Sequence, residues 1–156
     1  FKQKRLGWDG RAFTIYKFRT MKPHKERENK ITQATIDDQR FTLIGKWLRK
    51  SSFDELPQII NVLQGRMSLV GPRPHVAQHD NEYQKTIQGY VRRYSVKPGI
   101  TGWAQVNDLR GEIRSIDDIN RRLQHDLFYI ENWSLWFDLR IILTTIIKVF
   151  ISRQAW

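Results

Sequence analysis

The first 21 residues contain two short runs of apolar and polar positions that are typical of strands. Residues 4–6 and 13–16 flank Asp9-Gly10, a dipeptide that tolerates the positive φ angles of a tight hairpin turn. We therefore predict a β-hairpin that runs on into residues 17–21. Residues 23–39 are polar and lack periodicity, which predicts a loop of the kind that orders over a ligand.

Helical spacing begins after this loop. A basic amphipathic helix is predicted over residues 41–50, and a second helix is predicted to end near Gly65. The apolar positions of the first helix are Phe41, Ile44, Trp47 and Leu48, and those of the second are Leu56, Ile59, Ile60 and Leu63.

The middle of the chain predicts strands around two proline-containing turns. A short strand over residues 67–70 leads into Gly71-Pro72-Arg73-Pro74, which is not helical because each proline has a fixed φ and lacks a backbone donor. Residues 76–89 are predicted to be helical. Residues 90–96 and 100–106 are predicted to form strands on either side of the Pro98-Gly99 turn.

Two helices complete the pattern. Ser115 and Asp118 resemble a capping box that opens a helix continuing through Ile130. A last helix over residues 134–151 has two unlike sides. Its apolar side holds Trp136, Leu139, Leu143, Ile146, Ile147 and Phe150, and its polar side holds Asp138, Thr145, Lys148 and Ser152. Tryptophan with basic residues is typical of a helix lying on a bilayer, and an ordinary core-facing helix fits this pattern equally well.

Composition narrows the class of partner. The chain has 156 residues, with 27 Lys and Arg against 16 Asp and Glu, so its formal net charge is +11. The length suits one domain, and the charge indicates a polyanionic partner such as nucleic acid, anionic lipid or a phosphorylated substrate. The absence of cysteine excludes disulfides, cysteine-based zinc sites and a thiol nucleophile. Because the chain starts at Phe1 and has no long uncharged apolar run, we expect a fragment that carries no membrane span.

The segment Ser52–Pro57 contains the densest group of candidate catalytic residues. One interpretation is a capping box with Ser52 as N-cap and Glu55 at the third helical position. Pro57 favours a helix that starts at Asp54 instead, because a missing N–H is tolerated in the first turn. A carboxylate there faces the positive end of the helix dipole, which suits a nucleophile or a metal ligand with Glu55 as second acid.

Two other residues stand out by their surroundings. Arg73 lies between two prolines and either offers a rigidly held guanidinium to phosphate or belongs to a stiff surface loop. Asp126 falls within the apolar stripe of its helix, where a carboxylate must pair with an arginine, bind a metal or open into a cleft. The histidines lack metal-site spacing and are predicted to be surface residues, with His75 and His79 on one helix face.

Five motifs occur in the order and spacing of the bacterial sugar transferases. They are Lys17-Phe-Arg-Thr-Met21, Asp54-Glu-Leu-Pro-Gln58, Met67-Ser-Leu-Val-Gly-Pro-Arg-Pro74, Pro98-Gly-Ile-Thr-Gly-Trp-Ala-Gln-Val-Asn107 and Asp126…Tyr129…Asn132-Trp-Ser-Leu-Trp136. Over essentially all of residues 1–156, the chain resembles the catalytic domain of the polyprenyl-phosphate hexose-1-phosphate transferases. These monotopic phosphoglycosyltransferases initiate the assembly of exopolysaccharide, capsule or the O-antigen of lipopolysaccharide.

The resemblance implies an activity and a site. Glucose-1-phosphate or galactose-1-phosphate would pass from a UDP-sugar to undecaprenyl phosphate, with release of UMP and with Mg²⁺ as cofactor, at the cytoplasmic face of the bacterial inner membrane. Asp54 would be the nucleophile that forms an aspartyl-phosphosugar, and Glu55 its acidic partner beside the metal. Phosphate-binding roles would fall on Lys17, Arg19, Arg49 and Arg73. Nucleotide or sugar contacts would fall on Gln105, Asn107, Arg110 and Asp126. The family's N-terminal membrane anchor would precede Phe1.

Two other functions compete with this one. The basic first third favours a nucleic-acid-binding module, which leaves the Asp54-Glu55 pair unexplained. A peripheral membrane adaptor accounts for the last helix but not for Arg73. We therefore expect a transferase with no nucleic-acid partner and leave its oligomeric state open. Its expected architecture is one α+β domain: a hairpin and short strands surrounded by helices, with an amphipathic helix over 134–151 against an anionic membrane surface.

Overall fold

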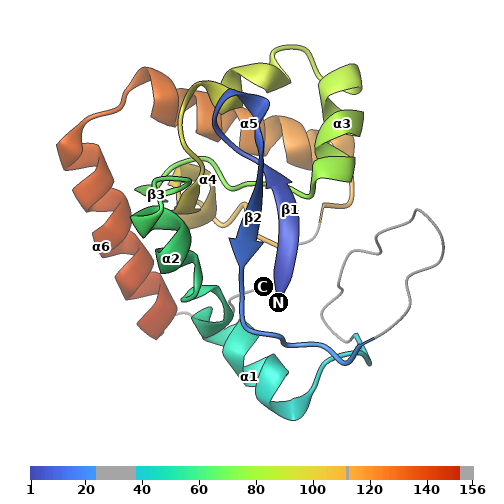
Figure 1. Ribbon diagram of the computed structural model, residues 1–156. Helices are drawn as coiled ribbons and strands as arrows, with labels where there is room; N and C mark the ends of the chain where they lie inside the picture. The colour runs from blue at the N-terminus through green and yellow to red at the C-terminus, as the bar shows by residue number, and fades with distance from the viewer. Residues whose placement is uncertain (24–37, 112, 152–156) are drawn as a thin grey trace.

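A small β-hairpin lies against a set of helices in the computed structural model, which describes residues 1–23, 38–111 and 113–151 (Figure 1). The strands are β1 (Lys2–Leu6), β2 (Ala12–Tyr16), β3 (Ser68–Val70) and β4 (Gly99–Thr101). The α-helices are α1 (Leu43–Lys50), α2 (Gln58–Leu63), α3 (Ala77–Thr86), α4 (Trp103–Val106), α5 (Ile116–Glu131) and α6 (Leu135–Ile151). Three short 3₁₀ helices join them: η1 (Trp8–Gly10), η2 (Phe53–Glu55) and η3 (Tyr90–Ser95). This mixture of helices and two-stranded sheets confirms the α+β prediction.

The predicted hairpin is confirmed. Strands β1 and β2 pair antiparallel with Leu6 opposite Ala12, and both turn residues, Asp9 and Gly10, have positive φ. The strand nevertheless ends at Tyr16, so residues 17–21 do not extend it as predicted. They leave the sheet to contact other segments, because the backbone N–H of Phe18 donates to the carbonyl oxygen of Asp54 at 2.9 Å. The predicted loop over residues 23–39 lies mostly outside the described residues.

A second, parallel pair joins β3 to β4, with Val70 opposite Thr101. The predicted strand over 67–70 is therefore confirmed. The strand predicted over 100–106 is wrong beyond Thr101, because α4 begins at Trp103. The strand predicted over 90–96 is wrong altogether. Tyr90 and Arg93 are both buried, and the three-residue repeat of the 3₁₀ helix η3 places them on the same side.

Helix α5 connects two parts of the core and lies behind the hairpin in Figure 1. It begins at the predicted capping box, which is confirmed: Ser115 Oγ accepts from the Asp118 N–H, and Asp118 Oδ2 accepts from the Ser115 N–H. One core cluster contains Ile87, Tyr90, Ile119 and Leu123, and the other contains Val70, Val106, Tyr129 and Ile141. Helix α5 thus packs against both β3 and η3 through these two clusters.

Helix α2 has its polar side inward. Gln58 and Asn61 are 1% and 0% exposed. The Asn61 side chain donates from Nδ2 to the carbonyl oxygen of Thr14 at 2.7 Å and accepts at Oδ1 from the N–H of Tyr16 at 3.1 Å. The apolar side predicted for this helix faces outward, and its residues, Leu56, Ile59, Ile60 and Leu63, are 46–83% exposed.

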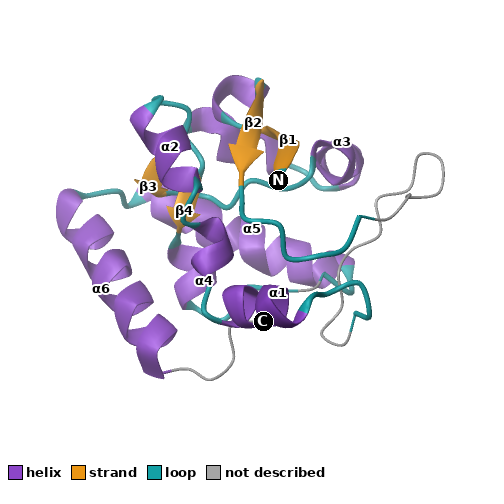
Figure 2. Cartoon of the chain, turned by 60° about the horizontal axis from the view of Figure 1, so that its bottom comes forward, coloured by secondary structure: helices purple, strands orange, loops and turns teal. Residues whose placement is uncertain are grey.

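Helices α1 and α6 also have exposed apolar residues. Ile44 and Trp47 of α1 are exposed. The side of α6 that faces the protein contains both the buried Ile141 and polar residues, since Thr145 bonds Thr101 and Lys148 pairs with Asp108. The outward residues of α6 include Trp136, Leu139, Leu143, Ile146 and Ile147. Figure 2 shows α6 along one edge, with α2 and α4 between it and the hairpin. In the described ranges, no helix has the length and apolar character needed to cross a membrane.

Candidate active site

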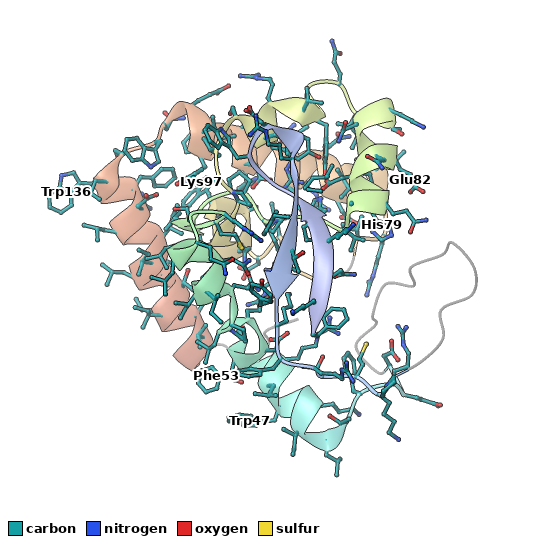
Figure 3. The ribbon with its side chains drawn as sticks, viewed as in Figure 1. Trp47, Phe53, His79, Glu82, Lys97 and Trp136 are labelled. Atoms are coloured by element: carbon teal, nitrogen blue, oxygen red, sulfur yellow. The ribbon has the colours of Figure 1, made fainter. Side chains whose placement is uncertain are left out.

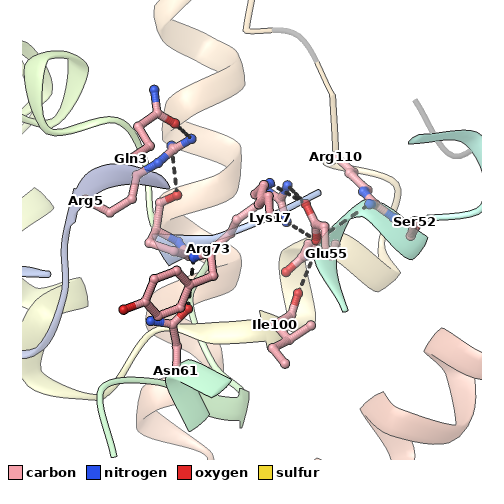
Figure 4. A network of polar contacts seen from close by, with 12 residues as sticks. Gln3, Arg5, Lys17, Ser52, Glu55, Asn61, Arg73, Ile100 and Arg110 are labelled. Atoms are coloured by element: carbon pink, nitrogen blue, oxygen red, sulfur yellow. Dashed lines mark hydrogen bonds and ion pairs between the residues drawn. The ribbon is translucent and has the colours of Figure 1, made fainter. Parts of the chain in front are cut away.

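Glu55 lies at the centre of a charged cluster assembled from four segments of the chain (Figure 4). Its Oε1 accepts a hydrogen bond from Nζ of Lys17 at 2.7 Å. Arg73 binds the same carboxylate with both terminal nitrogens, Nη1 to Oε2 at 3.0 Å and Nη2 to Oε1 at 2.5 Å. Arg110 adds a third cation, with Nη2 3.9 Å from Oε2 and Nη1 donating to Oγ of Ser52 at 2.9 Å. Bidentate, charge-assisted pairs of this kind are among the stronger hydrogen bonds in proteins.

The local sequence places both carboxylates inside the molecule. Ser52 has φ 61°, a left-handed conformation that turns the chain sharply after α1. Residues Phe53–Glu55 then form the separate turn η2, and α2 starts only at Gln58, after Pro57. The predictions that Asp54 or Ser52 caps a continuous helix are therefore wrong. The break instead buries Asp54 and Glu55, which are 5% and 6% exposed.

Charge compensation decides the ionisation of Glu55. Burial alone would raise its pKa, but Arg73 and Lys17 outweigh burial and hold the pKa of Glu55 well below its usual range. Burial lowers the pKa of Lys17 to about 8, against the opposing effect of Glu55. The cluster therefore contains an anion at neutral pH and a lysine that titrates at mildly alkaline pH.

Asp54 has a different environment from its neighbour. Burial and the charge of Glu55 raise the pKa of Asp54, while nearby cations, including Lys17 and Arg49, oppose the rise. Arg49 lies at the end of α1 with its guanidinium 4.8 Å from the ring centre of Phe41. Two adjacent carboxylates with pKa values shifted in opposite directions are characteristic of a catalytic pair.

The cluster contains some of the predicted site residues and not others. Lys17, Arg49, Asp54, Glu55, Arg73 and Arg110 come together. Gln105 donates from Nε2 to the carbonyl oxygen of Ile100 at 3.2 Å and lines the adjoining cavity. Asn107 is exposed and donates to the carbonyl oxygen of Trp103 at 2.7 Å, and Arg19 is also exposed. Asp126 lies elsewhere, buried against Arg93 at 2.9 Å, which matches the salt-bridge interpretation of its position.

The prediction that His75 is a surface residue is wrong. His75 is 9% exposed, precedes α3 and has Nδ1 2.7 Å from the hydroxyl oxygen of Tyr90. Burial and the charge of Arg93 hold the pKa of His75 well below its usual range. The sequence analysis also missed Arg93, because nothing in the sequence distinguishes this arginine from the many exposed basic residues around it.

A cavity of about 540 Å³ opens beside Glu55. Ser52, Glu55 and Arg110 of the charged cluster line one part of it. The other lining residues include the polar Thr101, Gln105, Asp108, Thr145 and Lys148 and the apolar Leu56, Ile59, Leu69, Ile100, Ile142, Ile146 and Val149. Such a cavity suits a ligand with a charged head and an apolar body.

Fold and site together define an α+β protein that has a buried acid pair, several cations around that pair and a cavity beside it. The family model described as "Bacterial sugar transferase" matches residues 1–152. The chain therefore belongs to the bacterial sugar transferase family, as the five motifs predict.

Its relatives carry names that specify donor and acceptor. The chain is 53% identical to the UDP-glucose:undecaprenyl-phosphate glucose-1-phosphate transferase of Xanthomonas campestris pv. campestris, over 100% of this chain and 32% of the relative. It is 49% identical to the protein of the same name in Escherichia coli, over 100% of this chain and 33% of the relative. A galactosyl transferase of Streptococcus agalactiae serotype III is 43% identical over 99% of this chain and 35% of the relative. The chain thus spans about a third of the length of these relatives.

Proposed function

We propose that this chain catalyses the transfer of glucose-1-phosphate from UDP-glucose to undecaprenyl phosphate. The observation that carries the proposal is the buried Asp54-Glu55 pair, which has Lys17, Arg73 and Arg110 around it and opens on an apolar cavity. Family membership supplies the reaction class, and the names of the two relatives at 49–53% identity favour glucose as the sugar.

Asp54 is the nucleophile of the proposed reaction. Its carboxylate oxygen attacks the sugar-bearing phosphorus of UDP-glucose, the bond from that phosphorus to the bridging oxygen breaks, and UMP leaves with the electron pair. The product is an aspartyl-phosphoglucose. A raised pKa makes the ionised Asp54 a stronger nucleophile.

The cations make this attack possible. A carboxylate that approaches a diphosphate is repelled unless positive charge lies between or beside the two anions. Arg49, Lys17 and Arg73 provide that charge near Asp54. Glu55 holds Arg73 and Lys17 in place through its hydrogen bonds, and in this way orients two groups that contact substrate phosphate.

Undecaprenyl phosphate accepts the sugar phosphate in the second step. An oxygen of the lipid phosphate attacks the phosphorus of the intermediate, the bond to Asp54 breaks, and the free carboxylate is regenerated. In this proposal Arg110 and Ser52, which line the cavity beside Glu55, bind the lipid phosphate, and the apolar part of the lining accepts the start of the prenyl chain.

The exposed apolar faces of α1, α2 and α6 favour attachment to a membrane surface. The side chains of Trp47 and Phe53 contact each other at 5.6 Å between ring centres, which joins α1 to η2. Residues of α2 and α6 share the cavity wall. Figure 3 shows Trp47, Phe53 and Trp136 pointing away from the protein. Exposed apolar side chains gathered on three helices favour an interaction surface, and basic residues on α1 suit anionic lipid at the cytoplasmic face.

Magnesium fits the proposed site through few protein ligands. Within the described ranges, no group of three metal-ligating side chains is present, and Mg²⁺ commonly binds one or two carboxylates together with substrate phosphates. Of the expected ligands, Asp54 is better placed than Glu55, whose two oxygens already accept hydrogen bonds from Lys17 and Arg73. When bound, the ion would neutralise charge on the diphosphate.

The decisive experiment follows UMP release by the full-length protein in membranes supplied with undecaprenyl phosphate. We expect turnover with UDP-glucose and little with UDP-galactose or UDP-N-acetylgalactosamine. Asp54→Asn should abolish turnover and the covalent intermediate while the protein stays folded. Glu131→Gln, which alters an exposed carboxylate, is the matched control and should retain activity.

Three outcomes would reject parts of the proposal. Full activity in Asp54→Asn would show that Asp54 is not the nucleophile. Equal or better turnover with UDP-galactose would reject glucose as the preferred sugar. Salt-dependent binding of DNA or RNA without release of UMP from any UDP-sugar would favour the nucleic-acid-binding alternative instead.

A further inference from the structure

The main chain of Pro72-Arg73-Pro74 is held at three successive carbonyl groups. The oxygen of Pro72 accepts from the N–H of Gly99 at 3.0 Å. The oxygen of Arg73 accepts from Nη2 of Arg93 at 2.6 Å, and the oxygen of Pro74 accepts from Nη1 of Arg5 at 3.3 Å. Because the prolines have no N–H to donate, hydrogen bonds to these carbonyls fix the orientation of the segment.

Arg93 is the buried member of this set. It is 4% exposed, and its Nη2 also donates to Oδ2 of Asp126 at 2.9 Å. Its Nη1 donates to the hydroxyl oxygen of Tyr90 at 2.6 Å, and Asp80 lies within 3.7 Å. A buried guanidinium is stable only when it is paired and hydrogen-bonded, so Asp126 is required to keep Arg93 in place.

We propose that Arg93, held by Asp126, is a positioning residue that fixes the backbone of Arg73 and thereby aims the Arg73 guanidinium at Glu55. One nitrogen of Arg93 bridges the Arg73 carbonyl and the Asp126 carboxylate. The Arg73 side chain, on the same residue, makes the bidentate contact with Glu55. Asp126 then acts through Arg93 rather than on nucleotide or sugar. The consequence for catalysis rests on the proposed function.

The chain contains a matched control for this pair. Arg92 and Glu131 join the same two elements, η3 and α5, by an ion pair of 2.6 Å, but their side chains are 59% and 52% exposed. Arg92→Lys and Glu131→Gln therefore repeat the chemistry of Arg93→Lys and Asp126→Asn in an exposed pair on the same two elements. Any effect on Arg73 should be confined to the buried pair.

The test measures turnover and its dependence on UDP-glucose concentration in the full-length protein in membranes. Lysine keeps the charge of Arg93 but cannot contact Tyr90, Asp126 and the Arg73 carbonyl together. We expect kcat to fall about tenfold to 100-fold in Arg93→Lys and Asp126→Asn. The KM for UDP-glucose should also rise, because a displaced Arg73 binds the substrate phosphate less well. A loss of folded enzyme alone would lower kcat and leave this KM unchanged.

A second measurement does not depend on the reaction. Hydrogen–deuterium exchange of the peptide covering residues 67–77 should be faster in Arg93→Lys and Asp126→Asn than in the wild type, and unchanged in Arg92→Lys and Glu131→Gln. If Arg93→Lys does not fold, both measurements are made on Asp126→Asn alone.

The outcomes separate this inference from the proposed function. Wild-type kcat and an unchanged KM for UDP-glucose in both buried-pair variants, in an active enzyme, would overturn the positioning role and leave the proposed transferase activity intact. An inactive wild-type protein would reject the proposed function, and the exchange rates would then decide whether Arg93 holds the Arg73 segment.

Discussion

The ammonium nitrogen of Lys17 lies 2.7 Å from Oε1 of Glu55, an oxygen that also accepts a hydrogen bond from Arg73. Three charged groups, from the segment after β2, from η2 and from the loop after β3, thus meet at one carboxylate oxygen. Their separation in sequence means that the cluster exists only in the folded chain, and its ionisation controls what it can bind.

Lys17 should produce an alkaline limit to activity. Its pKa is lowered to about 8, so the charged form that binds phosphate is lost as the pH rises through about 8. The contribution of Lys17 to the free energy of unfolding should change in the opposite direction. Between pH 8 and the ordinary value of 10.5, the unfolded lysine binds a proton that the native one has lost, so stability gains with pH. Activity and thermal unfolding measured from pH 6.5 to 10, in steps of about 0.5, test the expected fall in activity and the expected rise in stability.

Lys17→Arg should remove the alkaline limit, since arginine stays protonated in this range. Lys46→Arg on the exposed side of α1 is the control and should leave the profile as in the wild type. An unchanged alkaline limit in Lys17→Arg would show that another group titrates.

Asn61 should be more important for stability than its polar character suggests. Asn61→Ala removes the two hydrogen bonds that connect α2 to Thr14 and Tyr16 of β2 and leaves buried backbone groups unpaired. We expect a loss of about 2–4 kcal/mol in the free energy of unfolding. Asn132→Ala, which removes one exposed hydrogen bond at the C-terminal end of α5, should lose about 1 kcal/mol or less. Equal losses in chemical denaturation would contradict the bridging role.

Filling the cavity should weaken binding of the lipid substrate selectively. Ile146 is 48% exposed and lines the cavity, so Ile146→Trp narrows it without disturbing the core. We expect the KM for undecaprenyl phosphate to rise about tenfold while the KM for UDP-glucose stays within about twofold. Ile116→Trp, at the exposed start of α5, should change neither. A rise confined to the KM for UDP-glucose would assign the cavity to the nucleotide sugar.

The outward apolar residues should control membrane binding. Leu63 and Trp136 are 83% and 80% exposed, so Leu63→Ser and Trp136→Ser leave the core intact. Each apolar side chain that enters the bilayer contributes about 1.5–3 kcal/mol, so each variant should bind about tenfold or more weakly to vesicles of phosphatidylglycerol and phosphatidylethanolamine. Sedimentation of the 156-residue chain with such vesicles measures this, with Ile116→Ser as control. Wild-type binding by Leu63→Ser and Trp136→Ser would assign the apolar surface to another partner.

Local signals predicted those parts of the fold that depend on neighbouring residues. The Asp9-Gly10 turn and the Ser115–Asp118 capping box are confirmed because each is a short-range arrangement with its own backbone requirements. The strand predicted over residues 90–96 was wrong. The apolar and aromatic content of this segment favours a strand, but burial of Tyr90 and Arg93 on one side requires the three-residue repeat of a 3₁₀ helix. That requirement comes from the core cluster and from Asp126, which lie elsewhere in the chain.

The sequence by itself determined the motifs, the family and the presence of an acid pair near several cations. Tertiary structure decided which side of each helix faces the protein. Periodicity shows that α2 has one apolar and one polar side, but not which is buried, because a protein core and an apolar partner both favour the same residues. Only the folded chain pairs Asn61 with β2, leaves Leu63 exposed, and buries Arg93 between Asp126 and the backbone of Arg73. These contacts join residues that are distant in sequence, and the spacing of residues along the chain does not predict them.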